Sequence, residues 1–175
     1  TLILYYVKMY NEGGDIMSFK IRSKLIPKQG NNPGKRIKPD TIVIHYTAVP
    51  GCKAERLAGC FVNNNGGYNQ SCNYAVDCTE VICLIPAGFM SYGVSGHNEH
   101  IINIEVCYCD SDGRFELTTI ANLRELVRRL MRKWDIPSEK VVRHYDLTGK
   151  KCPEFYSYLE DEWRELHRMI TKGVV

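Results

Sequence analysis

The chain alternates between short, densely apolar runs and segments rich in glycine, proline and asparagine. Apolar runs with many β-branched residues are typical of strands that are buried on both faces of a sheet. Thr41–Tyr46 (TIVIHY) and Ile101–Tyr108 (IINIEVCY) have this character and predict two central strands. The segment 28–40 (PKQGNNPGKRIKP) instead predicts a loop that leads into the domain.

Three further runs complete the expected sheet. Asn73–Asp77 and Val81–Ile85 flank the turn Cys78-Thr79-Glu80 and predict a hairpin. Val141–Arg143 predicts a short strand that ends at His144.

Apolar residues recur at helical spacing in two longer segments. Thr118–Trp134 has them at positions 120, 123, 126, 127, 130, 131 and 134, which predicts a helix with one core-facing side. Glu154–Ile170 predicts a last helix that begins after Pro153 and buries positions 155, 159, 163, 166 and 170. A shorter helix is expected within Ala54–Val62, ended by the loop 63–67 (NNNGG). Strands interleaved with helices predict a single α/β domain with a central mixed sheet flanked by helices.

Composition agrees with one globular domain. The chain has 175 residues, of which 44% are hydrophobic and 25% charged, and these values exclude a disordered, collagen-like or membrane-embedded protein. The net charge of +3 is too small to indicate nucleic-acid binding, and no segment predicts membrane insertion. Oligomeric state cannot be read from the sequence, and a monomer is assumed.

The amino-terminal residues predict a boundary of their own. Residues 1–37 are expected to be an extension and lead-in, and 38–175 the folded domain. Glu12-Gly13-Gly14-Asp15 can be encoded by a strong bacterial ribosome-binding sequence just before Met17. One hypothesis is therefore that 1–16 is a translated leader and Met17 the natural start; the alternative is an ordinary extension.

Candidate chemistry begins with two histidines at predicted strand ends. His45 and His144 lie where α/β sheets build their sites, and Cys152 follows His144 by eight residues. Two imidazoles and a thiolate suit Zn²⁺ with one open coordination position. Each of the three also has an ordinary structural interpretation, as a buried histidine or a buried thiol.

Glu105 is the second candidate because it lies inside a strongly apolar strand. A buried carboxylate must be paired, hydrogen-bonded or neutralised. It can serve as a general base beside a metal, or form a structural salt bridge. Alternation places Cys107 and Cys109 on the same face of that strand.

Four segments together resemble a known family. They are IVIHYTA (42–48), SCNYAVD (71–77), INIEV (102–106) and RHYDLTGKKCP (143–153). In this order and spacing they resemble the zinc-dependent N-acetylmuramoyl-L-alanine amidases shared by autolysins, phage endolysins and peptidoglycan recognition proteins. The resemblance covers about residues 38–170 and implies their α/β fold.

The resemblance also implies the site. Its three zinc ligands fall on His45, His144 and Cys152, its catalytic glutamate on Glu105, and its oxyanion-stabilising lysine on Lys150. The implied reaction is hydrolysis of the amide between N-acetylmuramic acid and L-alanine in peptidoglycan by zinc-activated water.

Two departures from the family pattern are visible. Cys72 stands where some relatives have a tyrosine, and Tyr74, two residues on, is expected to point the same way. His97 and His100 are out of register with a cleft motif of the family and are interpreted as loop residues.

Three functions remain open at this point. The first is a phage or prophage endolysin, made in the host bacterial cytoplasm and then released to the cell wall; an autolysin would act outside the cell. The second is a peptidoglycan-binding module without catalysis, and the third a structural zinc domain. Eight cysteines also raise the question of a disulfide framework. The resemblance reduces it to one zinc thiolate and seven free thiols.

Overall fold

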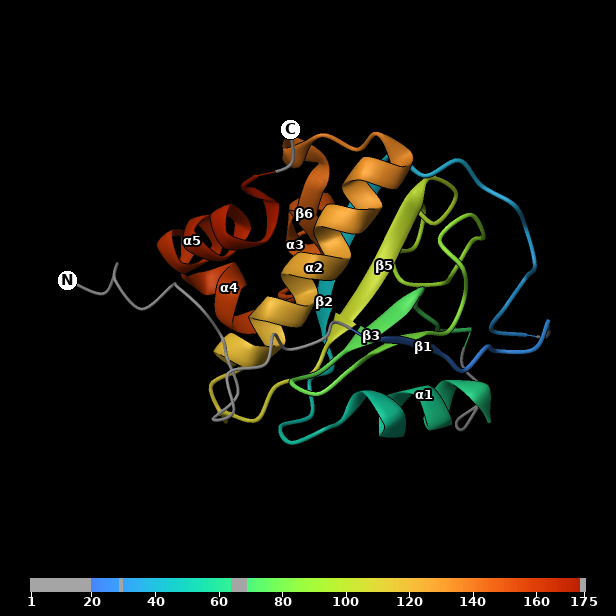
Figure 1. Ribbon diagram of the computed structural model, residues 1–175, viewed down its shortest axis with the longest axis horizontal. Helices are drawn as coiled ribbons and strands as arrows, with labels where there is room; N and C mark the ends of the chain where they lie inside the picture. The colour runs from blue at the N-terminus through green and yellow to red at the C-terminus, as the bar shows by residue number, and fades with distance from the viewer. Residues whose placement is uncertain (1–19, 29, 64–68, 174–175) are drawn as a thin grey trace.

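The computed structural model describes residues 20–28, 30–63 and 69–173 (Figure 1). The proposed start at Met17 and most of the loop expected at 63–67 lie outside the described residues. The described residues form a mixed sheet of six strands in the order β1-β4-β3-β5-β2-β6. The strands are β1 (Ile21–Ser23), β2 (Thr41–Tyr46), β3 (Tyr74–Val76), β4 (Val81–Cys83), β5 (Ile101–Val106) and β6 (Val141–Arg143).

Helices cover both faces of this sheet (Figure 1). They are α1 (Ala54–Val62), α2 (Leu117–Trp134), α3 (His144–Thr148), α4 (Glu154–Tyr158) and α5 (Glu160–Thr171), with a short 3-10 helix η1 (Ser138–Lys140). Of the paired strands described, β3 and β4 are antiparallel, as expected for a hairpin, and the other pairs are parallel. The expected α/β fold with a mixed sheet is therefore confirmed.

One face of the sheet carries the main hydrophobic core. Ile42 and Ile44 of β2 and Ile102 and Ile104 of β5 are fully buried there, because alternate strand residues point to the same side. They pack against the apolar side of α2, whose orientation agrees with the helical spacing in the sequence. The helix contributes Ile120, Leu123, Leu126, Val127, Leu130 and Met131.

The opposite face is covered in two separate patches. Ala54 and Ala58 of α1 pack on Ala75 and Ile82 at one side of the sheet. Val43 packs with a different cluster that includes Val94 and Ile101. His45, Asn103 and Glu105 alternate with the core residues of β2 and β5, so they lie on this second face.

The single last helix expected at Glu154–Ile170 is wrong, because the chain breaks at Leu159 into α4 and α5. In a continuous helix the Tyr156 carbonyl would accept from the amide four residues later. Here it accepts from the Arg143 guanidinium at 2.7 Å. Leu159 consequently leaves the helical face and is 45% exposed instead of buried.

Several boundaries also differ from expectation. β5 ends at Val106, so the strand pattern does not continue to Tyr108, and the hairpin strands are shorter than predicted. His144 is the first residue of α3, not the end of a strand. Strand β1 was not predicted, since its residues Ile21–Ser23 are exposed and carry no alternating apolar pattern.

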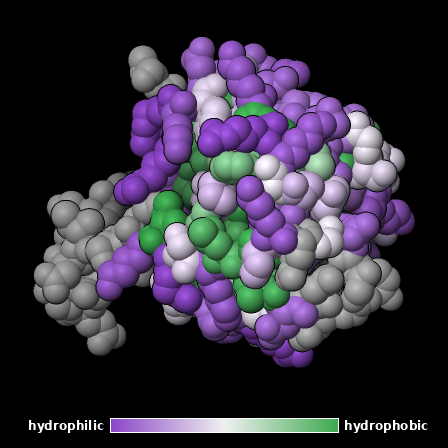
Figure 2. Space-filling model, turned by 90° about the vertical axis from the view of Figure 1, so that its right-hand side faces the viewer, coloured by the Kyte–Doolittle hydropathy of each residue, from purple (hydrophilic) through white to green (hydrophobic). Residues whose placement is uncertain are grey.

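The surface is mostly hydrophilic on the face shown in Figure 2, with hydrophobic residues gathered near its centre. None of the described helices combines the length and the apolar character that crossing a membrane requires.

Candidate metal centre and active site

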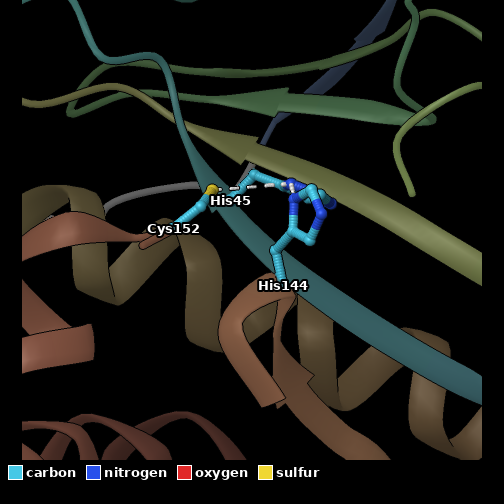
Figure 3. A group of neighbouring side chains, drawn as sticks. All are labelled: His45, His144 and Cys152. Atoms are coloured by element: carbon cyan, nitrogen blue, oxygen red, sulfur yellow. Dashed lines mark hydrogen bonds between the residues drawn. The ribbon is translucent and has the colours of Figure 1, made fainter. Parts of the chain in front are cut away.

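Three side chains, one from β2 and two from the segment after β6, meet at the carboxyl end of β2 (Figure 3). His45 is the fifth residue of β2, and His144 follows β6, which pairs with β2 in parallel. Cys152 lies in the turn between α3 and α4. Parallel pairing brings the ends of β2 and β6 to the same edge of the sheet, so the predicted group is assembled by topology.

The distances within this group suit a small metal ion. His45 Nδ1 lies 3.1 Å from His144 Nδ1 and 3.7 Å from Cys152 Sγ. The three potential ligand atoms all lie within 4.8 Å of one another. Tetrahedral zinc with ordinary bond lengths separates two nitrogens by about 3.3 Å and a nitrogen and a sulfur by about 3.6 Å. The two pairs to His45 already have nearly these separations, so the donor set fits zinc.

Local structure explains how Cys152 reaches the group. Gly149 ends α3 with φ of 75°, a left-handed conformation that glycine adopts without steric cost. The chain then turns back, and the Cys152 amide donates to the Lys150 carbonyl at 2.7 Å. The Tyr145 amide donates to the Cys152 carbonyl at 2.9 Å, which fixes the cysteine against the start of α3.

Burial sets the protonation of the three donors. It lowers the pKa of His45 to about 3, with the nearby His144 adding to the effect, and it lowers the pKa of His144 to about 4, with Lys150 and His97 contributing. Both rings are therefore neutral near pH 7, the form in which imidazole binds a metal. Burial and the charge of Glu105 raise the pKa of the Cys152 thiol to about 12. A bound cation reverses that preference, since it stabilises the thiolate.

Glu105 lies directly beside this group. It is paired in register with His45 on the neighbouring strand, and in parallel strands such partners point to the same face. Its Oε2 atom is buried and has no hydrogen-bond partner among the described residues. Burial raises the pKa of Glu105 to about 8, while the positive charge of Lys150 acts in the opposite direction. A carboxyl group with a strongly raised pKa beside such a cluster is typical of a functional site.

Lys150 lies on the exposed turn between α3 and Cys152. Its charge acts on all four groups just described: it lowers the pKa of His45, of His144, of Glu105 and of Cys152. The ammonium group is thus part of the electrostatic environment of the cluster and is accessible from solvent.

Sequence reasoning missed one residue of this site, Asn103. It is fully buried, and its Oδ1 atom lies 3.0 Å from His45 Nε2, on the side of the ring away from the other two donors. The available signal was a polar residue in the centre of an apolar strand, two positions before Glu105 and therefore on the same face.

The expectation that Tyr74 points the same way as Cys72 is wrong. Tyr74 packs in the core on the α2 side of the sheet, whereas Cys72 packs on the opposite face. β3 begins only at Tyr74, so strand alternation does not extend back to Cys72. The Cys72 thiol instead lies beside the Glu105 backbone amide.

The remaining candidates lie around the site. β5 ends at Val106, so strand alternation does not set the orientation of the two cysteines that follow it. Cys107 is buried in the cluster under α1, and Cys109 is exposed. His100 Nδ1 lies 3.0 Å from Asp40 Oδ1, away from the metal cluster. His97 is close enough to His144 to lower its pKa, yet it is not one of the three clustered donors. All eight cysteines are free in the structure.

The fold and this cluster define an α/β domain with a candidate His-His-Cys metal centre and an adjacent glutamate whose Oε2 atom is buried without a partner. Residues 35–155 match the family model described as N-acetylmuramoyl-L-alanine amidase, and the chain belongs to this family.

Individual relatives agree with that assignment. The chain is 36% identical over 146 residues to the N-acetylmuramoyl-L-alanine amidase CwlA of Bacillus sp, covering 79% of this chain. It is 31% identical over 159 residues to CwlH of Bacillus subtilis, covering 87% of this chain. It spans only part of these curated relatives, 51% of CwlA and 62% of CwlH.

A solved structure titled as a mutant endolysin from Bacillus subtilis has the same fold, with a TM-score of 0.75 and 29% identity. The match covers 87% of this chain and 99% of the endolysin chain. Similarity therefore extends over nearly the whole of that structure.

Proposed function

We propose that this chain is the catalytic domain of a zinc-dependent peptidoglycan hydrolase that cleaves the amide between N-acetylmuramic acid and L-alanine. The observation that carries the proposal is the convergence of two neutral imidazoles and a thiol beside a carboxyl group whose Oε2 atom is buried without a hydrogen-bond partner. Membership of the amidase family supports the bond that is cleaved. The catalytic domain is assigned to residues 38–175, and 1–37 to an extension and lead-in whose strand β1 joins the edge of the same sheet beside β4.

The metal is assigned to His45 Nδ1, His144 Nδ1 and Cys152 Sγ, because the two separations to His45 fit zinc and all three donors lie within 4.8 Å of one another. Three protein donors leave one tetrahedral position open, as in catalytic rather than structural zinc sites. When bound, zinc supplies Lewis-acid chemistry that polarises a carbonyl and activates water at neutral pH.

Glu105 is assigned the proton transfers. It lies beside His45 and on the same face, so its carboxylate can take a proton from the attacking water. It then returns that proton to the amine of the departing peptide. A pKa raised to about 8 by burial suits a group that must both accept and release a proton near neutral pH.

Lys150 is assigned to oxyanion stabilisation. Its exposed ammonium belongs to the turn that carries Cys152, and its charge already acts on each of the four buried groups. A positive charge fixed next to the polarised carbonyl favours the negative charge that develops on oxygen, which is usually the largest catalytic contribution.

Purified cell walls test the reaction. The wild-type chain should lower the turbidity of a wall suspension, and mass spectrometry should find stem peptides with free amino-terminal L-alanine. A chelator should stop the reaction and added zinc should restore it. Products that retain the muramoyl–alanine amide would contradict the proposed bond.

Two variants separate the assigned roles. Cys152→Ala should lose both zinc and hydrolysis, because it removes a ligand. Glu105→Gln should keep one equivalent of zinc and lose hydrolysis, because it removes only the proton acceptor. A fully active Glu105→Gln variant would show that the base is another residue. Wall binding by the wild type without any cleavage would instead favour a recognition module.

The cellular role follows the relatives. Similarity to a structure titled as an endolysin supports a phage or prophage lysis enzyme, made in the host cytoplasm and released to the wall. Similarity to CwlA and CwlH keeps a bacterial autolysin as the second candidate. Lysis of cells from outside and from within, compared in one host, would distinguish these roles.

A further inference from the structure

A chain of buried amide and hydroxyl groups leads from the loop after β4 to the candidate metal centre. Asn73, Ser91 and Asn103 are linked by hydrogen bonds and end at His45. We propose that this chain fixes the tautomer and orientation of the His45 ring, so that its Nδ1 lone pair faces the metal position. Asn103 and Ser91 are then positioning residues for His45 as a metal ligand. The part of the inference that concerns metal binding rests on the proposed function.

The far end of the chain sets its direction. Asn73 Nδ2 lies 3.1 Å from the Ile85 carbonyl and 3.1 Å from the Phe89 carbonyl, and carbonyl oxygens only accept hydrogen bonds. The amide nitrogen of Asn73 must therefore face them. Its Oδ1 atom is left for the other side, where it accepts from the Asn103 backbone amide at 2.8 Å.

Each following link is then determined by the one before it. Ser91 Oγ lies 2.8 Å from Asn73 Oδ1, an atom that only accepts, so the hydroxyl must donate its one hydrogen bond to it. Ser91 Oγ can consequently only accept from Asn103 Nδ2, which lies 2.9 Å away. The amide of Asn103 is thereby turned with its Oδ1 atom toward His45 Nε2, at 3.0 Å.

The last link decides the state of the histidine. Asn103 Oδ1 can only accept, so His45 Nε2 carries the ring proton and Nδ1 carries the lone pair. Nδ1 is the atom that lies 3.1 Å from His144 Nδ1 and 3.7 Å from Cys152 Sγ. The tautomer selected by the chain is thus the one that binds a metal at this position.

Packing keeps the links in place. Asn73, Ser91 and Asn103 are 0% exposed and His45 is 2% exposed, so water cannot readily replace a partner. A Cβ atom on Gly93 would lie 2.3 Å from both Cγ and Oδ1 of Asn103, which is impossible without displacing the amide. A glycine at this position therefore leaves the room that Asn103 occupies.

The loop that supplies Ser91 and Gly93 is itself held by a side chain. Asn98 Oδ1 accepts from the Gly93 amide at 3.0 Å and from the Val94 amide at 2.9 Å. The segment 91–98 thus holds Asn103 in place, and through Asn103 it supports His45.

Histidine ¹⁵N chemical shifts test the inference in the full chain with and without zinc. In the metal-free wild type, His45 should be the Nε2–H tautomer, and Asn103→Ala should give a mixture of tautomers. A metal-free wild type with His45 as Nδ1–H or as a mixture would overturn the proposal. This measurement does not need metal binding or activity, so it stands even if the proposed function fails.

Zinc affinity, measured by competition with a chromophoric chelator, provides the second readout. Loss of a group that orients a metal ligand typically weakens binding about 10- to 100-fold, and Asn103→Ala should do so. Asn103→Asp keeps an acceptor for Nε2–H and should lose less than Asn103→Ala. Gly93→Ala should also weaken binding, because it displaces the amide.

Asn31→Ala is the matched control. Asn31 is 1% exposed and donates to the Phe61 carbonyl, in another part of the fold. It should lower stability without changing zinc affinity or the His45 tautomer. If Asn103→Ala does not fold, Ser91→Ala provides the test, since it frees the Asn103 amide to rotate. If the wild type binds zinc and folded Asn103→Ala or Ser91→Ala binds it with unchanged affinity, this inference is wrong. The proposed function would not be affected by that result.

Discussion

Replacing Glu105 by glutamine should make the metal-free protein more stable at neutral pH, although it removes the proposed base. Burial raises the pKa of this carboxyl group from 4.5 to about 8. Below pH 4.5 the folded and unfolded chains both hold the proton, and the wild type has no penalty. As the pH rises, the unfolded chain ionises first, so the contribution of Glu105 to wild-type stability falls until the folded carboxyl group also ionises.

The size of this effect follows from the same interval. Each pH unit between the two pKa values costs about 1.36 kcal/mol, so by pH 7 the wild type should lose on the order of 3 kcal/mol relative to the glutamine variant. The loss should level off above pH 8, where both states are ionised. Glutamine is neutral throughout and avoids it. Such a gain is a large fraction of the about 5–15 kcal/mol that stabilises a typical domain.

Urea denaturation of chelator-treated protein at pH 4, 5.5, 7 and 8.5 measures the difference. The wild type and Glu105→Gln should have equal free energies of unfolding at pH 4, and the variant should become the more stable of the two toward pH 7. Contributions from the histidines are common to both and cancel. The control is the same substitution at an exposed glutamate, Glu139→Gln, measured in parallel. A constant offset between Glu105→Gln and wild type, or lower stability of the variant at pH 7, would refute the reasoning.

Three further outcomes are expected. The metal-free protein should lose stability as the pH falls below about 6.5, because unfolding lets the two clustered histidines take up protons that burial denies them; zinc should oppose this loss near pH 6 in the same denaturation experiment. Leu123→Ala, at a fully buried core position, should cost about 3 kcal/mol on unfolding and leave the zinc equivalents per chain unchanged. In a thiol titration of the folded protein, exposed Cys60 and Cys109 should react first, and Cys152 should react only after chelation and unfolding, because its thiol is buried.

The parts of the fold that were predictable are those whose pattern is local. β2 and β5 are continuous apolar runs, and α2 has seven apolar positions on one side, so packing and periodicity specify both. At the break before Leu159, by contrast, the Tyr156 carbonyl accepts a hydrogen bond from Arg143, a residue of a different element. No local pattern around Leu159 carries that information.

The candidate site shows the same division. The three donors and Glu105 could be proposed from strand ends, a buried charge and motif spacing. Asn103 could not be assigned a partner, because its contact with His45 depends on the register of β5 against β2. The opposite orientation of Tyr74 and Cys72 depends on where β3 begins, which the sequence does not mark.

His45 is far from the other two donors along the sequence, and this separation has a consequence for the stability of the fold. His45 is 99 residues from His144 and 107 residues from Cys152. An ion bound by all three would act as a crosslink between the first third of the chain and its end. For comparison, a disulfide that closes a loop of about 100 residues restricts the unfolded chain by nearly 5 kcal/mol. The metal centre would then stabilise the fold as well as supply chemistry. All three ligands could bind the ion only after residue 152 had been synthesised.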